Sequence, residues 1–404
     1  MSKPLKVLMM GGRRCGKTSA LASLFAQTTN GEVKNYFTAS DRTLLETKGF
    51  EKQDSLGDKT LELVNMLESN KGNSNIFLVD KDPTNNYWTY KLHLQIPGTR
   101  REMDIEFRDS AGEFFESSGI HSAETTEYIQ NCDVFVIVID TPYLMGPVEE
   151  TTKDLCPESI NLGTNRVMDI QNFLTNINDN EGKDAKMVVF VPLKCEKWVK
   201  ENRINEVTAR IKKVYATCIQ NLMAYSKMSI SIIPMETSGN ILFSELKKAY
   251  YFHDETGEFS DLYPKNRPGD VRCCLIDDET VRLENGEHEL FADICKIDAE
   301  SVINGTNLTR PYAWYHINPE DGSFAPHNCE QLPLHIIRFM LSKLYDAETR
   351  KSGGHFGWFS DLIRRIGQVF GTMDPKELQG IINKMQRNGV IKDSGFGIEI
   401  LKKI

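Results

Sequence analysis

The stretch that decides the fold is KVLMMGGRRCGKTSALASLF, from Lys6 to Phe25. It opens with a short apolar run suited to a buried strand and closes with leucine and phenylalanine residues at helical spacing. The segment between them fits the pattern G-x-x-x-x-G-K-[ST], in which glycines let backbone amides curl around phosphate oxygens at a helix N-terminus. We therefore predict a loop that binds the phosphates of a nucleoside triphosphate; the alternative is a chance glycine-rich turn.

Two side chains of this loop have defined expected roles. The ammonium of Lys17 is expected to reach the β- and γ-phosphates, and the hydroxyl of Thr18 is expected to hold Mg²⁺.

Composition narrows the class of protein. The chain has 404 residues, of which 26% are charged and 40% hydrophobic, values that are ordinary for a globular protein. A net charge of -9 argues against nucleic acid as a partner, because such binders present a basic face. Nine cysteines without a regular framework indicate reduced thiols, and no apolar stretch approaches the roughly 20 residues of a transmembrane helix. We expect a cytoplasmic protein without a transmembrane segment.

Downstream segments add further signals of nucleotide chemistry. The stretch MDIEFRDSAG alternates apolar and polar residues and then ends in Asp109-Ser110-Ala111-Gly112, which fits the D-x-x-G pattern. A carboxylate at the end of a strand beside the phosphate loop can hold the Mg²⁺ shell, and the amide of Gly112 can meet the γ-phosphate. Upstream, Thr84 precedes a predicted strand at residues 88–96.

The remaining buried runs predict the fold class. Residues 132–140, 186–194 and 229–235 are apolar runs that alternate with amphipathic helical stretches. Alternation of this kind predicts an α/β fold of the P-loop NTPase type, a doubly wound and mostly parallel sheet with its functional loops at the carboxyl ends of the strands. Two of these ends carry Leu193-Lys194-Cys195-Glu196 and Glu236-Thr237-Ser238-Gly239.

Taken in order, these five loops from Lys6 to Gly239 resemble the nucleotide loops of the Ras-like, TRAFAC-type small GTPase superfamily. The resemblance implies a switch that binds and hydrolyses GTP. It places Thr84 on Mg²⁺ in the triphosphate state and Asp109 on the water shell of the metal. Loss of the γ-phosphate would then release the loops around Thr84 and Gly112.

The resemblance also assigns the base-contacting residues. It places Lys194 along the base and Glu196 on the guanine N1 and N2 hydrogens. Leu193 stands where the family has asparagine, and Glu196 is one methylene longer than the usual aspartate. A carboxylate still favours GTP over ATP, because adenine has no N1–H donor. The full predicted nucleotide-contacting set is Gly11, Gly12, Arg14, Cys15, Gly16, Lys17, Thr18, Ser19, Gly112, Lys194, Glu196, Ser238 and Gly239.

Two residues are candidates for catalysis beside Lys17. Glu113 occupies the position of the glutamine that orients the attacking water in the family; it can accept a hydrogen bond from water, but its charge faces an anionic phosphate. A catalytic role and a solvated loop carboxylate both stay open. Arg13 is interpreted as stabilising the γ-phosphate in cis, with a solvent-facing side chain as the alternative. A nucleotide-binding scaffold with little turnover and a P-loop ATPase are the alternative functions.

The domain organisation follows from changes in pattern along the chain. A helical insertion beside Thr84 is a natural place for contacts with a protein effector or regulator, with a role in packing alone as an equal alternative. Farther on, Asn285-Gly286 and Asp321-Gly322 each indicate a hairpin. The predicted parts are a GTPase-like domain at 1–240 with the insertion at 31–81, a β-rich insertion at 241–331, a last helix of the domain at 332–349, and a helical or winged-helix-like module at 354–404.

Overall fold

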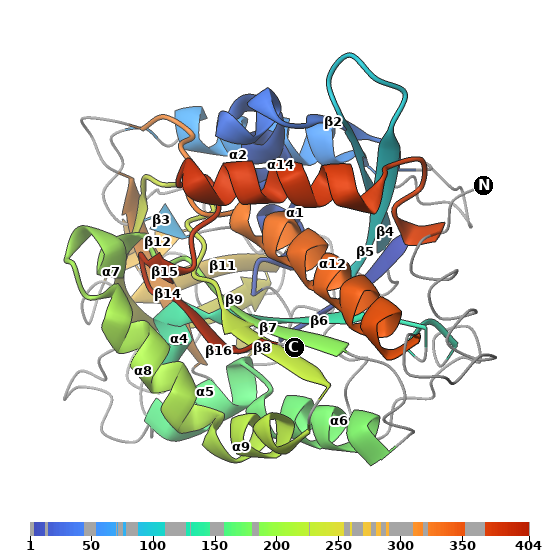
Figure 1. Ribbon diagram of the computed structural model, residues 1–404. Coiled ribbons are helices and arrows are strands. Elements are labelled where there is room, and N and C mark those ends of the chain that lie inside the picture. Colours follow the sequence, from blue (N-terminus) through green and yellow to red (C-terminus); the bar gives the residue numbers. More distant parts are fainter. Residues whose placement is uncertain are drawn as a thin grey trace.

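The computed structural model of the protein describes residues 4–12, 15–43, 54–69, 71, 76–77, 88–109, 127–129, 131–145, 157–179, 186–225, 227–253, 259–260, 270–275, 280–283, 288–290, 310–317, 322–351 and 368–403. A nine-stranded sheet lies at the centre of these residues, with helices on both of its faces (Figure 1). The arrangement is the predicted α/β fold with a mostly parallel core.

Five parallel strands form the middle of this sheet. β1 (Leu5–Met10) pairs with β5 (Glu102–Asp109) on one side and with β6 (Val134–Asp140) on the other. β7 (Lys186–Leu193) and β8 (Met228–Ile232) continue the parallel order beyond β6. These strands are almost wholly buried because helices cover both faces. Their carboxyl ends, and the loops that follow, therefore lie along one edge of the sheet.

Antiparallel strands extend the sheet at both sides. β4 (Trp88–Gln95) pairs with β5, and β2 (Thr38–Asp41) pairs with β4. At the opposite side β16 (Ile398–Lys402) pairs with β8, and β15 (Ser394–Gly395) pairs with β16. β16, the last described strand of the chain, therefore lies next to β8.

Two layers of helices enclose the sheet (Figure 1). One layer holds α1 (Lys17–Asn30), α2 (Leu56–Ser69), α12 (Gln331–Lys351) and α14 (Pro375–Arg387), with the short 3-10 helix η1 (Glu32–Asn35) after α1. The other holds α5 (Pro157–Thr164), α6 (Val167–Asp179), α8 (Ile204–Val214) and α9 (Ala216–Ala224). Each layer packs on its own apolar core. Among the described helices, none combines the length and the apolar character that a bilayer span requires.

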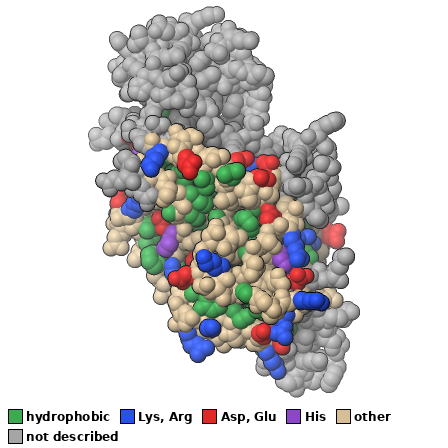
Figure 2. Space-filling model, turned by 90° about the horizontal axis from the view of Figure 1, so that it is seen from above, with side chains coloured by type: hydrophobic (Ala, Val, Ile, Leu, Met, Phe, Trp, Pro, Cys, Tyr) green, Lys and Arg blue, Asp and Glu red, His purple; other side chains and the backbone are tan. Residues whose placement is uncertain are grey.

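Figure 2 views the molecule from the side of α2 and α14. Lysine and arginine side chains are interspersed there with aspartate and glutamate, and the described part of this face carries no continuous basic area. Charges of both signs mixed in this way give no electrostatic footprint for a phosphate backbone on this face.

A second, seven-stranded sheet contains most of the predicted β-rich region. β9 (Ile241–His253) pairs with β14 (Arg310–Ile317), and β14 also pairs with β3 (Ile76–Phe77) from the insertion before Thr84. The sheet also contains β10 (Phe259–Ser260), β11 (Asp270–Leu275), β12 (Thr280–Leu283) and β13 (His288–Leu290). β12 and β13 are antiparallel neighbours, as the Asn285-Gly286 signal predicts.

The structure differs from the prediction of a second hairpin at Asp321-Gly322. β14 has β9 and β3 as its strand partners, and residues 322–330 form no strand. These residues instead run back to the loop after β8, where His327 and Glu236 form an isolated antiparallel bridge. The Asp-Gly signal depends only on adjacent residues, whereas the segment that follows it pairs with Glu236, which is distant in the sequence.

The described C-terminal residues pack on the main sheet and on the helices of the α1 layer. The predicted helix and hairpin are present as α14, β15 and β16, but β16 extends the main sheet and α14 buries Leu378, Ile382 and Met385 in the core of the α1 layer. β16 covers the edge of β8 that would otherwise be open. The apolar face of α14 needs a packing partner, and the core of the α1 layer provides one. The domain boundaries themselves stay a prediction.

Candidate nucleotide-binding site

The predicted phosphate loop joins β1 to α1, as its sequence pattern requires. A Cβ atom at Gly12 would lie 1.9 Å from the carbonyl oxygen of Thr164, so only glycine fits there. Gly16 precedes α1 with a φ of 98°, a conformation that favours glycine. The buried ammonium of Lys17 donates to the carbonyl oxygens of Gly11 at 3.3 Å and Gly12 at 3.1 Å. The described loop residues thus form a glycine cradle with a cation turned into it.

A pair of oxygen ligands suited to a metal lies beside this loop. Thr18 Oγ1, in the first turn of α1, donates to Asp109 Oδ2 at the end of β5 over 2.5 Å. Asp109 is 2% exposed, and burial raises the pKa of its carboxyl, while the charge of Lys17 and the bond from Thr18 oppose that rise. Hydroxyl and carboxylate oxygens are ligands that Mg²⁺ prefers. These two residues therefore fit a Mg²⁺ ion held next to phosphates.

The predicted base-contacting residues lie together at the ends of β7 and β8. Glu196 is 1% exposed, and its Oε1 accepts from the backbone and hydroxyl of Ser238, both at 3.0 Å, and from the amide of Gly239 at 3.4 Å. Its other oxygen, Oε2, is buried without a hydrogen-bond partner among the described residues. Burial raises the pKa of this carboxyl, and the backbone bond from Ser238 opposes the rise. An unpaired buried acceptor is costly and marks a position for a donor from a ligand.

The phosphate side and the base side form one site. Leu193 Cδ1 lies 3.4 Å, and Lys194 Cε 3.8 Å, from the position that a Cβ atom at Gly16 would take. Farther along α1, Ser23 Oγ donates to the carbonyl oxygen of Thr237 over 2.6 Å. The loop after β7 and the loop after β8 thus both contact α1 or the loop before it.

Comparison with known proteins agrees with this geometry. The family model described as Double-GTPase 2 matches residues 7–243, which span the phosphate loop, Asp109 and both base-side loops. The chain belongs to the Double-GTPase 2 family. The match identifies this part as a GTPase-type P-loop domain that binds guanine nucleotide, whereas the closer resemblance to Ras-like proteins stays a prediction. A search of curated proteins found no match.

Sequence reasoning missed one charged residue of this Double-GTPase 2 domain. Asp140, the last residue of β6, is 2% exposed, and its Oδ2 lies 2.5 Å from Lys194 Nζ. A signal was available, because a charged residue directly after a buried strand lies at the edge where the functional loops gather. Asn165 and Tyr315, which also surround this pair, carry no such signal.

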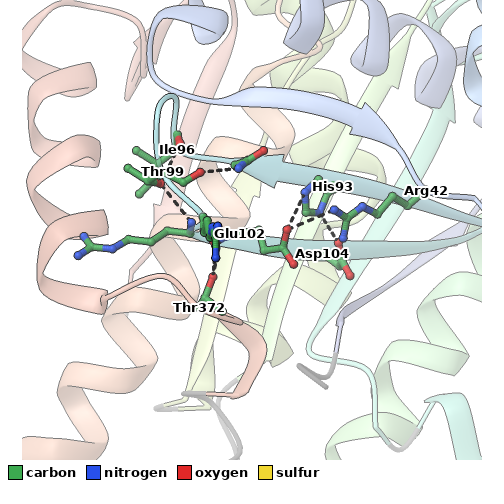
Figure 3. Close-up of polar contacts among 10 residues, drawn as sticks. Arg42, His93, Ile96, Thr99, Glu102, Asp104 and Thr372 are labelled. Carbon is green, nitrogen blue, oxygen red and sulfur yellow. Dashed lines mark hydrogen bonds and ion pairs between the residues drawn. The ribbon is translucent and has the colours of Figure 1, made fainter.

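The β4–β5 hairpin is fixed at the end far from the nucleotide site (Figure 3). His93 Nδ1 lies 2.8 Å from Asp104 Oδ1, and Arg42 Nη2 donates to Glu102 Oε2 at 3.2 Å. Thr372, after Phe370 of the C-terminal segment, donates its backbone N–H to the Glu102 carbonyl at 3.1 Å and accepts the Glu102 N–H at its Oγ1 at 2.9 Å. Asp109 lies at the other end of β5, where Thr18 donates to it, so both ends of this strand are held by side-chain contacts.

Several predicted site residues lie outside the described residues. They are Arg13, Arg14, Thr84, Gly112 and Glu113. Their assigned roles on the phosphates, on Mg²⁺ and in hydrolysis stay predictions. Cys15 and Ser19 are described: Cys15 is buried, and burial raises the pKa of its thiol, so it stays protonated.

Proposed function

We propose that this chain is a Mg²⁺-dependent switch that binds and hydrolyses GTP. The observation that carries the proposal is the pairing of Thr18 with Asp109 at 2.5 Å beside Lys17, at the N-terminus of a helix that follows a glycine cradle. A hydroxyl, a carboxylate and an ammonium in this arrangement match the needs of a triphosphate that carries a divalent cation.

Each phosphate-side residue has a role in this proposal. Lys17 would exchange its bonds to the Gly11 and Gly12 carbonyls for phosphate oxygens. Thr18 and Asp109 would hold Mg²⁺, which, when bound, neutralises charge that develops on the phosphates. The amides of residues 12–18 would wrap the phosphates at the positive end of α1.

Glu196 supports GTP over ATP as the nucleotide. Its Oε1 is engaged by Ser238 and Gly239, which fixes the carboxylate, and its Oε2 is free to accept from a ligand. Guanine offers N1–H and N2–H donors to such an acceptor. Adenine would place a lone pair at N1 against it, and an unpaired buried acceptor is strongly disfavoured.

The switch itself is assigned to loops that flank the anchored hairpin. Thr84 precedes β4 and Gly112 follows β5, so both would report the γ-phosphate from the same open end of one hairpin, where Trp88 lies opposite Asp109. Glu113 would orient the attacking water and Arg13 would stabilise the γ-phosphate in cis. The insertion at 31–81 is the proposed contact surface for a protein effector or regulator.

A nucleotide-binding scaffold with little turnover is the second candidate. The buried Leu193 supplies no side-chain amide to the base loop. Glu113 carries a charge at the position where hydrolysis calls for a neutral group. A P-loop ATPase is the third candidate, and the acceptor at Glu196 speaks against it.

Phosphate release from purified protein supplied with GTP or ATP, with and without Mg²⁺, separates these candidates. GTP turnover that disappears in Lys17→Ala is the expected result. Tight binding of GTP without release would support the scaffold, and a preference for ATP would contradict the base assignment. The variant Glu196→Gln gives a sharper test of the base: an amide can donate to the C2 carbonyl of xanthine, so it should favour XTP over GTP.

A further inference from the structure

The site contains a buried ion pair that the proposed function does not use. Asp140 Oδ2 and Lys194 Nζ are 2.5 Å apart, and their side chains are 2% and 19% exposed. Burial alone would lower the pKa of Lys194, but the charge of Asp140, its hydrogen bond to Lys194 and the nearby Tyr315 and Tyr143 together outweigh that effect, and the pKa lies well above its usual value. Lys194 therefore carries its positive charge at neutral pH. A buried pair of this kind is costly to assemble, so its placement calls for an explanation.

The backbone of Asp140 is itself held in place by a buried amide. Its N–H donates to Asn165 Oδ1 at 2.7 Å, and Asn165 Nδ2 donates to its carbonyl oxygen at 3.2 Å. Asn165 is 0% exposed and is bonded in turn to Asn161 Oδ1 at 2.9 Å. The carboxylate thus leaves β6 from a fixed point at the edge of the sheet where the nucleotide site lies.

Lys194 needs support from outside its own loop. Its φ of 59° is a left-handed conformation that residues other than glycine seldom adopt. The preceding residue, Leu193, is buried and apolar and offers no polar side chain to hold the loop. With its ammonium on Asp140 and its Cε against Gly16, the alkyl chain of Lys194 lies across the gap between β7 and the phosphate loop. The ring of Tyr315 from the second sheet lies 5.9 Å from the same ammonium.

We propose that Asp140 is a positioning residue of the base site, which holds Lys194 against the phosphate loop so that its alkyl chain covers the guanine. This inference rests on the proposed binding of guanine nucleotide. Asp140 acts through Lys194 and does not itself contact the nucleotide, so its loss should shorten the lifetime of the complex and leave the phosphate contacts of Lys17 and Thr18 in place.

The test is the dissociation rate of a fluorescent GDP analogue, measured by stopped flow on the full chain. Asp140→Asn keeps the shape and removes the charge, and we expect release to become about tenfold faster, as is usual for a coupled contact pair. Asp140→Glu keeps the charge and should give a smaller change. Lys194→Met should also speed release, and the double variant Asp140→Asn/Lys194→Met should release no faster than Lys194→Met alone.

A matched control exists at the other end of the same strand region. Asp133, just before β6, pairs with Lys343 Nζ at 2.6 Å, and the Lys343 side chain is 5% exposed. Asp133→Asn breaks an ion pair of the same kind far from the base loop. We expect it to lower the unfolding temperature without changing the release rate.

The outcomes separate this inference from the proposed function. If the wild-type chain does not bind the GDP analogue, the proposed function fails and this inference fails with it. If the wild type binds but Asp140→Asn releases at the wild-type rate, or if the Asp140 and Lys194 effects add, only the positioning role is overturned. If Asp140→Asn does not fold, a wild-type release rate in Lys194→Met overturns the role in the same way.

Discussion

His335 on α12 should make the stability of the fold depend on pH. The ring is 2% exposed; its Nε2 donates to the Lys392 carbonyl at 2.9 Å, and its Nδ1 accepts from Arg338 Nη2 at 2.9 Å. The bond from Arg338 requires the neutral ring, because a proton on Nδ1 would face the donor of a guanidinium. Lowering the pH is therefore a direct perturbation of the contact between α12 and the C-terminal segment.

The magnitude follows from the shift in pKa. Burial first, and then the charge of Arg338, lower the pKa of His335 from 6.5 to about 4. Below the pKa of His335 in the unfolded chain, the unfolded chain takes up a proton that the folded chain does not bind. Stability that is present above this pKa is therefore lost as the pH falls to the folded pKa. The interval between 6.5 and about 4, at about 1.36 kcal/mol per pH unit, corresponds to about 3 kcal/mol.

Urea unfolding of the wild type and of His335→Gln, at several pH values from about 7 to about 4.5, tests this prediction. Glutamine can donate to Lys392 and accept from Arg338 without titrating, so it is the matched control. The free energy of unfolding of the wild type should fall over this range by up to about 3 kcal/mol more than that of the variant. Parallel curves for the two proteins would refute the neutral, buried state of His335 and its contact with Lys392.

Three further predictions concern the nucleotide site. Gly12→Ala should weaken GTP binding at least about tenfold by calorimetry, because its methyl group would press on the Thr164 carbonyl; wild-type affinity would contradict this packing. Removal of Mg²⁺ should speed GDP release from the wild type and have little effect on Asp109→Asn, which lacks the charged ligand; equal acceleration in both would argue against Asp109 as a metal ligand. Glu196→Gln should cost GTP affinity about 2 kcal/mol or more in competition assays, and an unchanged affinity would exclude Glu196 from the base contacts.

The parts of the site that the sequence predicts are those set by local pattern and strand direction. The glycine spacing before Lys17 and the position of Asp109 at a strand end are enough to predict that Thr18 and Asp109 lie close together, because neighbouring parallel strands end at the same edge of a sheet. The pairing of Glu196 with Ser238 follows from the same rule.

Contacts between distant segments could not be predicted in this way. β16 joins β8, and β3 joins β14, through backbone bonds that any extended segment can form, so the sequence carries little information on the partner. The same holds for His335, whose burial depends on where Lys392 docks. Asp140 is an intermediate case, since its place at a strand end is predictable but its partner Lys194 is not.

The most direct test of the central proposal is calorimetric titration of Mg·GTP and Mg·ATP into the wild-type chain and Lys17→Ala. We predict association of the wild type with GTP, weaker association with ATP, and loss of binding in the variant. Absence of binding to either nucleotide by the folded wild-type protein would contradict the assignment of the glycine cradle, Lys17 and the Thr18–Asp109 pair as a triphosphate site.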